Sequence, residues 1–290
     1  MPSLIDLRRR IQSVKNTQQI TKAMKMVSAA KLRRAQQAVI NSRPYSTLLE
    51  EMIGSVVAHG GDEQEALSHP LLERRASRKI LLLVLAGEKG LCGAFNSNVF
   101  KACDSFLVER RGRGQDVELE LLGRKAAEHY KRADATVSGT WEQIFGSVQR
   151  SAAAEVAAKA MRRFTDGEVD EVWALYSQFQ SVLRRDVTLR QVLPILPSEA
   201  EGGASVGYDY EEPPEELLGA LLPKKVVTQV FVAMLDSAAA EHAARMMAMD
   251  AATRNAGEVV DKLTLHLNKV RQASITTEII EIVSGAVSQE

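Results

Sequence analysis

The distribution of proline constrains this chain most, because residues 3–43 and 224–290 contain none. Proline inside a helix removes a hydrogen bond and clashes with the preceding turn, so a proline-free stretch allows an unbroken helix. At 1.5 Å per residue the first stretch allows a helix of about 40 residues and roughly 60 Å, and the second one of about 65 residues and close to 100 Å. Globular helices are much shorter. We therefore predict two long terminal helices that pack against each other.

Heptad spacing of apolar residues supports this pairing at both ends. The seam residues are Leu4, Leu7, Ile11 and Val14 in the first stretch, and Val260, Leu263, Leu267 and Val270 in the second. Polar residues then take the seam positions, at Gln18 and Thr21 and at Ser274 and Thr277. The apolar stripes shift to Ile20, Met24 and Val27, and to Ile275, Ile279, Ile282 and Ala286. The pattern predicts an antiparallel coiled coil whose two seams are interrupted.

The middle of the chain alternates between strand-like and helix-like segments. Apolar strands are expected at residues 79–87, 116–123, 171–179 and 186–197, and helices at 98–110, 124–133 and 151–164. Strands that alternate with helices favour an α/β layer with a partly parallel, Rossmann-like sheet. The expected domains are a first helix at 1–58, a linker at 59–78, the α/β domain at 79–197, an acidic loop at 198–222 and a second helix at 223–290.

Charge is unevenly distributed although the whole chain is neutral. Residues 1–43 contain ten Lys or Arg and one acid, Asp6, which gives that stretch a net charge of +9 and leaves −9 for the remainder. Such asymmetry points to an acidic partner for the first helix, or to no more than a solvated face. The chain begins without an apolar secretory signal, and no window of about 18 apolar residues is expected, so a cytoplasmic protein is predicted.

The most enzyme-like feature is the segment LAGEKGLCGAFN, a strand followed by a glycine-rich turn and a helix start. This topology can hold phosphates. However, Gly87, Gly90 and Gly93 fit neither the dinucleotide nor the P-loop pattern. Cys92 has no neighbouring base and is better explained by tight packing. A nucleotide-binding α/β enzyme with a helical dimerisation arm remains the alternative, and no cofactor or metal is expected.

Nucleic acid and membrane lipid are weaker candidates for the partner of the basic helix. Arg8, Arg9, Arg10, Arg33 and Arg34 could contact phosphates, but no aromatic residue lies among them for base stacking. A helix lying flat on a membrane would need more large apolar residues and an aromatic anchor. A basic coiled-coil protein that binds nucleic acid stays a third hypothesis.

The sequences of both ends resemble that of the γ subunit of F-type ATP synthase. The matching segments are RRRIQSVKNTQQITKAMKMVSAAKLRRAQ, EHAARMMAMDAATRNAGEVVDKL and NKVRQASITTEIIEIVSGA, together with KGLCGAFN in the middle. The order of parts matches over essentially the whole chain. The resemblance implies a non-catalytic rotor shaft that couples proton flow through a ring of c subunits to ATP synthesis at the β subunits. Its implied partners are α and β in a 3:3:1 complex with this chain, the ε subunit and the c ring.

The resemblance also assigns contacts to individual residues. It implies β-subunit contacts for Lys22, Lys25, Met26, Lys31, Arg245, Arg271 and Gln272. It places Ile275, Ile279 and Ile282 in an apolar sleeve formed by the surrounding subunits, and Tyr208 and Glu211 in a foot against the c ring and ε. The absence of a transit peptide favours a bacterial protein, held peripherally at the cytoplasmic face of the inner membrane only through the c ring. No nucleic acid is expected.

Overall fold

The computed structural model describes residues 4–59, 69–196 and 213–287. The residues form two compact units, one of residues 1–28 and 245–290 and the other of residues 29–244. Two long helices run through both, α1 (Leu4–His59) and α5 (Pro214–Val287). We call the first the helical unit and the second the sheet unit, and describe each by itself.

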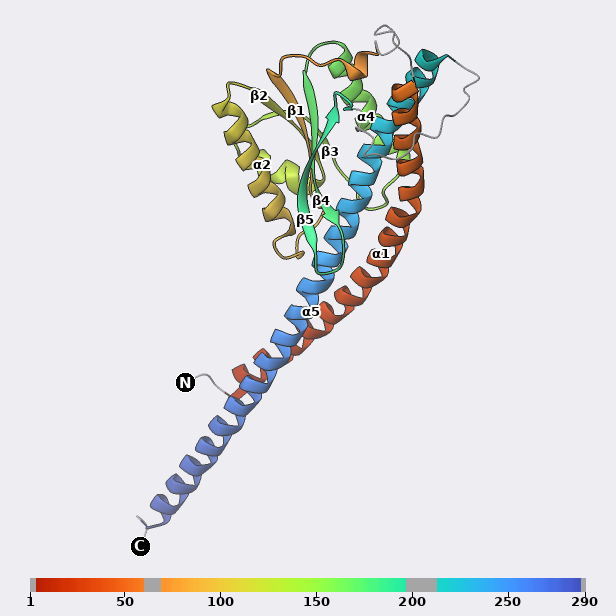
Figure 1. Cartoon of the computed structure of the whole chain (residues 1–290). Coiled ribbons are helices and arrows are strands. Elements are labelled where there is room, and N and C mark those ends of the chain that lie inside the picture. The colour runs from red at the N-terminus through yellow and green to blue at the C-terminus, as the bar shows by residue number, and fades with distance from the viewer. Residues whose placement is uncertain (1–3, 60–68, 197–212, 288–290) are drawn as a thin grey trace. The chain divides into compact units, whose positions relative to one another are not determined.

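The sheet unit contains five strands in the order β3-β2-β1-β4-β5 (Figure 1). Their bounds are β1 Lys79–Leu85, β2 Asp116–Leu122, β3 Thr136–Trp141, β4 Glu171–Phe179 and β5 Arg185–Leu193. The first four strands are parallel and β5 is antiparallel to β4. This confirms the expected α/β layer with a partly parallel sheet.

Four shorter helices accompany these strands in the described part of the chain. They are the 3-10 helix η1 (Pro70–Leu72) and the α-helices α2 (Phe95–Gly112), α3 (Arg124–Tyr130) and α4 (Arg150–Thr165). The three α-helices match the three expected ones to within a few residues. The helix at the carboxyl end begins earlier than expected, at Pro214, and contains Pro223. The last part of the expected acidic loop is therefore helical.

Strand β3 was not predicted from the sequence. It forms one edge of the sheet, none of its side chains is buried, and Gly139 lies in its middle. Its pairing with β2 also contains a register shift between Leu119 and Glu120. A short edge strand with glycine inside and no apolar run lacks the signals on which strand prediction depends.

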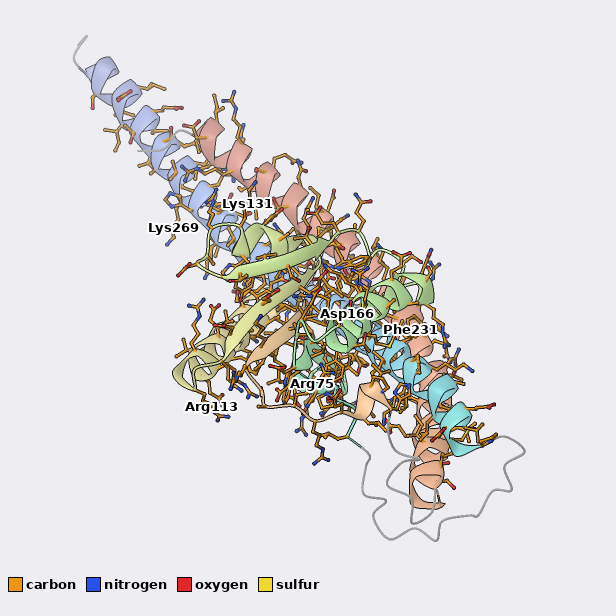
Figure 2. The ribbon with its side chains drawn as sticks, turned by 90° about the horizontal axis from the view of Figure 1, so that it is seen from above. Arg75, Arg113, Lys131, Asp166, Phe231 and Lys269 are labelled. Atoms are coloured by element: carbon orange, nitrogen blue, oxygen red, sulfur yellow. The ribbon has the colours of Figure 1, made fainter. Side chains whose placement is uncertain are left out.

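Each face of the sheet has its own apolar core. The alternating side chains of β1 point to opposite faces, as the two-residue period of a strand requires. Ile80, Leu82 and Val84 pack with α2 and α3, whereas Leu81, Leu83 and Leu85 pack with α4 and with the parts of α1 and α5 in this unit. Charged side chains such as Arg113 lie at the periphery (Figure 2).

Between Glu215 and Ser284, α5 contains an 18-residue window with a mean hydropathy of 1.5. The expectation that no such window exists is therefore wrong. Half of that window is buried within the protein, and the core helix of a water-soluble protein satisfies the same criteria of length and composition as a membrane span.

Candidate partner-contact surface

The helical unit is an antiparallel pair made by the beginning of α1 and the second half of α5. Gln18 of α1 donates to the backbone of Thr253, and Lys25, further along α1, bonds to Asp250, earlier on α5. The two chains therefore run in opposite directions. This confirms that the terminal helices pack together.

The seam of this pair keeps strict heptad spacing, so the expected interruption is wrong. On α1 buried or half-buried side chains recur at heptad spacing at Leu4, Leu7, Ile11, Val14, Gln18, Thr21, Lys25 and Ser28, and Met24 is half-buried as well. On α5 they recur at Met249, Thr253, Ala256, Val260, Leu263, Leu267, Val270 and Ser274, and the stretch from Arg245 to Ala248, Asp250, Ala252 and Gly257 are also buried or half-buried. The facing helix supplies partners for three of the polar residues on the seam, Gln18, Thr21 and Lys25.

These polar partners form one section of the pair. Thr253 Oγ1 donates to Thr21 Oγ1 over 2.8 Å, and the Nζ atom of Lys25 lies 2.6 Å from Asp250 Oδ1. Arg254 also reaches the carboxylate of Asp250, at 3.4 Å. The hydrogen bond from Lys25 lowers the pKa of the Asp250 carboxyl, and the charges of Lys25 and Arg254 act in the same direction.

The apolar stripe that leaves the seam of α1 faces outward. Of the expected stripe, Ile20 and Val27 are 60% and 57% exposed, whereas Met24 is half-buried. Met26 is 60% exposed, and Lys22 is exposed as well. Large apolar side chains next to cations on an exposed helix face are typical of a protein-contact surface. The sequence analysis identified an apolar stripe outside the seam, but its inference that the seam is interrupted there was wrong.

The last described part of α5 has no partner helix within the unit. Every described side chain from Ile275 to Ser284 is exposed, with Ile279 at 55% and Ile282 at 71%. Figure 1 shows α5 extending past the described start of α1. Ile280 and Val283 are also more than half exposed, and the seam analysis did not select them. At 100° per residue these large apolar side chains lie on one face of the bare segment, and Thr277, Glu278, Glu281 and Ser284 lie on the opposite face.

The remaining predicted contact residues lie in different environments. Arg271 and Gln272 are exposed on α5, and Lys31 is exposed on the part of α1 that belongs to the sheet unit. Arg245 is only 9% exposed. Tyr208 and Glu211 lie outside the described residues. The structure thus brings Lys22 and Met26 to one outer face, and Arg271 and Gln272 to a stretch of α5 in the same unit.

The glycine-rich turn of the alternative hypothesis lies at the carboxyl end of β1, beside the β1/β4 boundary where strand order reverses. Nucleotides bind at this place in doubly wound folds. Here the space next to Gly87 is filled by the chain itself: a Cβ atom on Gly87 would lie 2.9 Å from Glu241 Cδ and 3.2 Å from Asn96 Oδ1. A carboxylate of α5 at this position repels phosphate. Cys92 in the same turn is buried, as the packing interpretation predicted.

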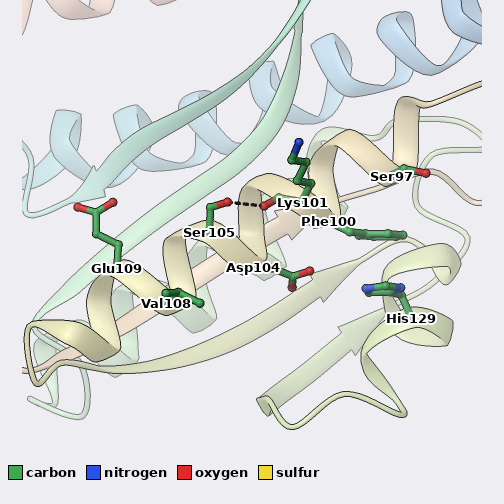
Figure 3. A pocket seen from close by; sticks show the side chains of 8 residues that line it. All are labelled: Ser97, Phe100, Lys101, Asp104, Ser105, Val108, Glu109 and His129. Atoms are coloured by element: carbon green, nitrogen blue, oxygen red, sulfur yellow. Dashed lines mark hydrogen bonds between the residues drawn. The ribbon is translucent and has the colours of Figure 1, made fainter.

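A shallow groove of about 820 Å³ lies elsewhere, along the outer face of α2 (Figure 3). The ring of His129 stacks on that of Phe100 with their centroids 4.2 Å apart, and Ser105 donates back to the carbonyl of Lys101. None of the turn residues lines this groove. Among the described residues, no cluster of His, Cys, Asp and Glu could hold a metal ion.

Known proteins match this chain over its full length. A family model described as ATP synthase matches residues 3–288. The ATP synthase gamma chain of Solibacter usitatus is 52% identical and aligns over 100% of both chains, and that of Geotalea daltonii is 45% identical over 99% of both. A chain in the mitochondrial ATP synthase of Euglena gracilis has the same fold, with a TM-score of 0.66 at 19% identity, covering 99% of this chain and 94% of that one.

The structure combines a long helix pair, which has an exposed cationic and apolar surface, with a glycine turn that the chain's own carboxylate closes. The relatives align with this chain from end to end. The chain therefore belongs to the ATP synthase gamma-chain family and is the non-catalytic central rotor stalk of F1.

Proposed function

We propose that this chain transmits rotation from a c ring to the catalytic β subunits within a 3:3:1 complex of α, β and this chain, together with ε. The solved relatives come from structures described as containing F1 and a c ring, or a central stalk and a c ring. The complex would lie peripherally at the cytoplasmic face of a bacterial inner membrane, attached through the c ring only.

The observation that carries the proposal is the bare apolar end of α5. Five large apolar side chains, Ile275, Ile279, Ile280, Ile282 and Val283, are each about half exposed or more. A single helix with this surface gains stability only when another protein covers it, because exposed apolar area is costly in water. We assign Ile275, Ile279 and Ile282 to an apolar sleeve formed by the α and β subunits.

Exposed side chains of α1 supply a second contact. Lys22 and Lys31 are exposed cations and Met26 is an exposed, adaptable apolar side chain. We assign them to an acidic segment of β, since opposite charge steers the encounter and fixes its orientation. Arg271 and Gln272 are assigned to β loops further along the shaft. Lys25 and Arg245, and Tyr208 and Glu211 in the foot, stay as predicted contacts.

Rotation can change the β subunits only through contacts that differ between their open and closed states. The helical unit satisfies this condition because its surface is uneven around its axis. Lys22 and Met26 project from α1, whereas α5 carries Arg271 and Gln272. Each β subunit would meet a different side of this unit, and turning it would exchange the state that each contact stabilises.

The test is reconstitution with the α and β subunits of the same organism. We expect a 3:3:1 complex by native mass measurement, with ATPase activity that depends on this chain. Titration of the isolated chain with ATP, ADP and NAD should show no binding, because Glu241 occupies the turn. If the chain remains separate and binds a nucleotide, the enzyme hypothesis replaces this one.

A further inference from the structure

We propose that the turn between β4 and β5, together with the side of α1 next to it, forms a further docking surface that receives an acidic segment of a β subunit. The surface consists of exposed apolar and cationic side chains, namely Leu183 and Arg184 in the turn and Arg33, Ile40 and Arg43 on α1. It adds a second element of the chain to the β contacts proposed on α1. The inference rests on the proposed function, which brings β subunits to this chain.

The β4–β5 turn is closed by hydrogen bonds and holds a large apolar side chain in water. The backbone N–H groups of Gln180 and Ser181 both donate to the carbonyl of Arg184. The Oγ atom of Ser181 accepts from the N–H of Arg184 over 3.0 Å. Leu183 is 78% exposed, more than any other large apolar side chain in the described part of the chain. The turn therefore presents this leucine on an ordered backbone.

Contacts at the base of the turn place it next to α5 and α1. The backbone of Phe179, the last residue of β4, donates to the carboxylate of Asp236 on α5, and the charge of Arg43 on α1 acts on the same carboxylate. Figure 1 shows the turn between β4 and β5 beside α5. At about 3.3 Å per strand residue, the tip extends no more than about 10 Å beyond Phe179. Leu183 and Arg43 therefore lie in the same neighbourhood of the sheet unit.

One side of α1 carries the same chemistry past this neighbourhood. Arg33, Ile40 and Arg43 follow one another at intervals of seven and three residues, so they lie within about 80° of one another around the helix. Ile40 is 48% exposed, and both arginines are exposed. Arg43 lies closest to the buried side of the helix, which contains Val39. This position allows Arg43 to act on Asp236 while Ile40 remains in water.

The chemistry of this surface fits an acidic protein segment. A leucine exposed alone needs no partner, but Leu183 lies with a second apolar side chain and with cations from two elements of the chain. Arg184 pairs with Asp186 at 3.1 Å, but the two side chains are 72% and 48% exposed, so the pair contributes little and a partner carboxylate can replace Asp186. The acidic segment of β proposed as the partner of Met26 has this chemistry, and Met26 precedes Arg33 by one heptad.

The contact would distinguish the three β subunits of the complex. This chain has one β4–β5 turn, so one β subunit at a time can occupy the surface in a given rotational position. A contact that only one β subunit makes can stabilise one of its conformations relative to those of the other two. Turning the chain would pass this contact from one β subunit to the next.

Photo-crosslinking in the assembled complex tests the contact. Leu183→Cys is labelled with benzophenone maleimide, and the chain is reconstituted with the α, β and ε subunits of the same organism before irradiation. We expect the label to join the acidic segment of β, which mass spectrometry of the joined peptides identifies. Arg113→Cys, an exposed position at the opposite ends of the parallel strands, is the matched control and should give no β product. Cys92 and Cys103 are buried, and the unsubstituted chain measures any labelling of them.

Charge reversal measures the strength of the contact. Leu183→Asp with Arg184→Glu should slow association of the chain with α and β by about tenfold at low salt, because opposite charge steers the encounter. The difference should shrink as salt rises. Val137→Asp with Arg132→Glu makes the same two kinds of change at exposed positions on and near β3, and should associate like the unsubstituted chain. Urea unfolding of each isolated chain verifies that both double variants remain folded.

The inference is overturned if the 3:3:1 complex forms but the label at position 183 joins α, ε or no subunit. It is overturned as well if the control double variant slows association equally, since a general charge effect would then explain the loss. If the unsubstituted chain forms no complex with α and β, the proposed function itself fails, and this inference fails with it. The two failures are therefore distinguished by whether the complex forms.

Discussion

Helix α5 contains two stretches of similar composition in opposite environments. From Ala233 to Arg245 every side chain is buried except that of His242, which is half-buried. From Ile275 to Ser284 every side chain is exposed. Each stretch includes two acids among mostly apolar or small residues. The number of acids therefore does not separate them, and the neighbouring elements do: most of the first stretch packs in the core of the sheet unit, whereas no described element covers the second.

The largest effect on stability is expected in the buried stretch, at Met234. This side chain is completely buried in the core that also contains α4. Met234→Ala should lower the free energy of unfolding by about 2–5 kcal/mol, because the lost apolar contacts leave a cavity. Urea denaturation of the full chain measures it. Met26→Ala, at a 60% exposed methionine, should change the same quantity by less than about 0.5 kcal/mol. Equal changes in the unfolding free energy of the two variants would contradict the expected difference between a buried and an exposed methionine.

A pH-dependent effect is expected from Asp236 in the same buried stretch. Burial raises its pKa from 3.8 to about 6, against the charges of Arg43 on α1 and Arg190 on β5 and a hydrogen bond from the backbone of Phe179. Tyr176 on β4 also faces this carboxyl. Because the folded-state pKa is raised, the stabilising contribution is complete below about pH 4 and is lost as the pH rises through about 6.

Asp236→Asn should therefore stabilise the chain at pH 8 by an amount approaching about 3 kcal/mol, and by much less at pH 4. Thermal unfolding across this range measures the difference. Glu278→Gln, an exposed acid in the bare stretch, serves as the control and should show no pH-dependent gain. A gain at pH 4 as large as that at pH 8 would exclude titration of Asp236 as the cause.

The smallest effect on the isolated chain is expected at Ile279 in the exposed stretch. Ile279→Asp should change the free energy of unfolding by less than about 0.5 kcal/mol, since the side chain is 55% exposed and packs on no core. Assembly with α and β should nevertheless weaken, because a charge would enter the apolar sleeve. Asn268→Asp, an exposed position outside the bare end, should assemble normally. Unchanged assembly and turnover of the Ile279→Asp variant would contradict the proposal that this part of α5 lies in an apolar sleeve.

In the sheet, sequence patterns are sufficient to predict some strands and their burial but not others. Strand β1 is a run of six buried aliphatic residues after Lys79 and was found directly. Glu120 of β2 is only 2% exposed, although its strand looked half polar, because Lys159, Ser138 and Trp141 all donate to its carboxylate. These donors come from α4 and β3, which are distant along the chain.

The sequence by itself determined the two long helices, the alternating α/β order and the family. Proline placement, apolar periodicity and sequence motifs can each be recognised within short stretches of the chain, without knowledge of the contacts made on folding. Only the tertiary structure decided that the seam stays packed through its polar residues. The sequence placed Gln18 and Thr21 on the seam, but as an interruption of it, and it did not place Lys25 there; Thr253 and Asp250 meet these three side chains from the opposite end of the chain. The favourable energy of a hydrogen bond or an ion pair depends on both partners, and their proximity exists only after folding.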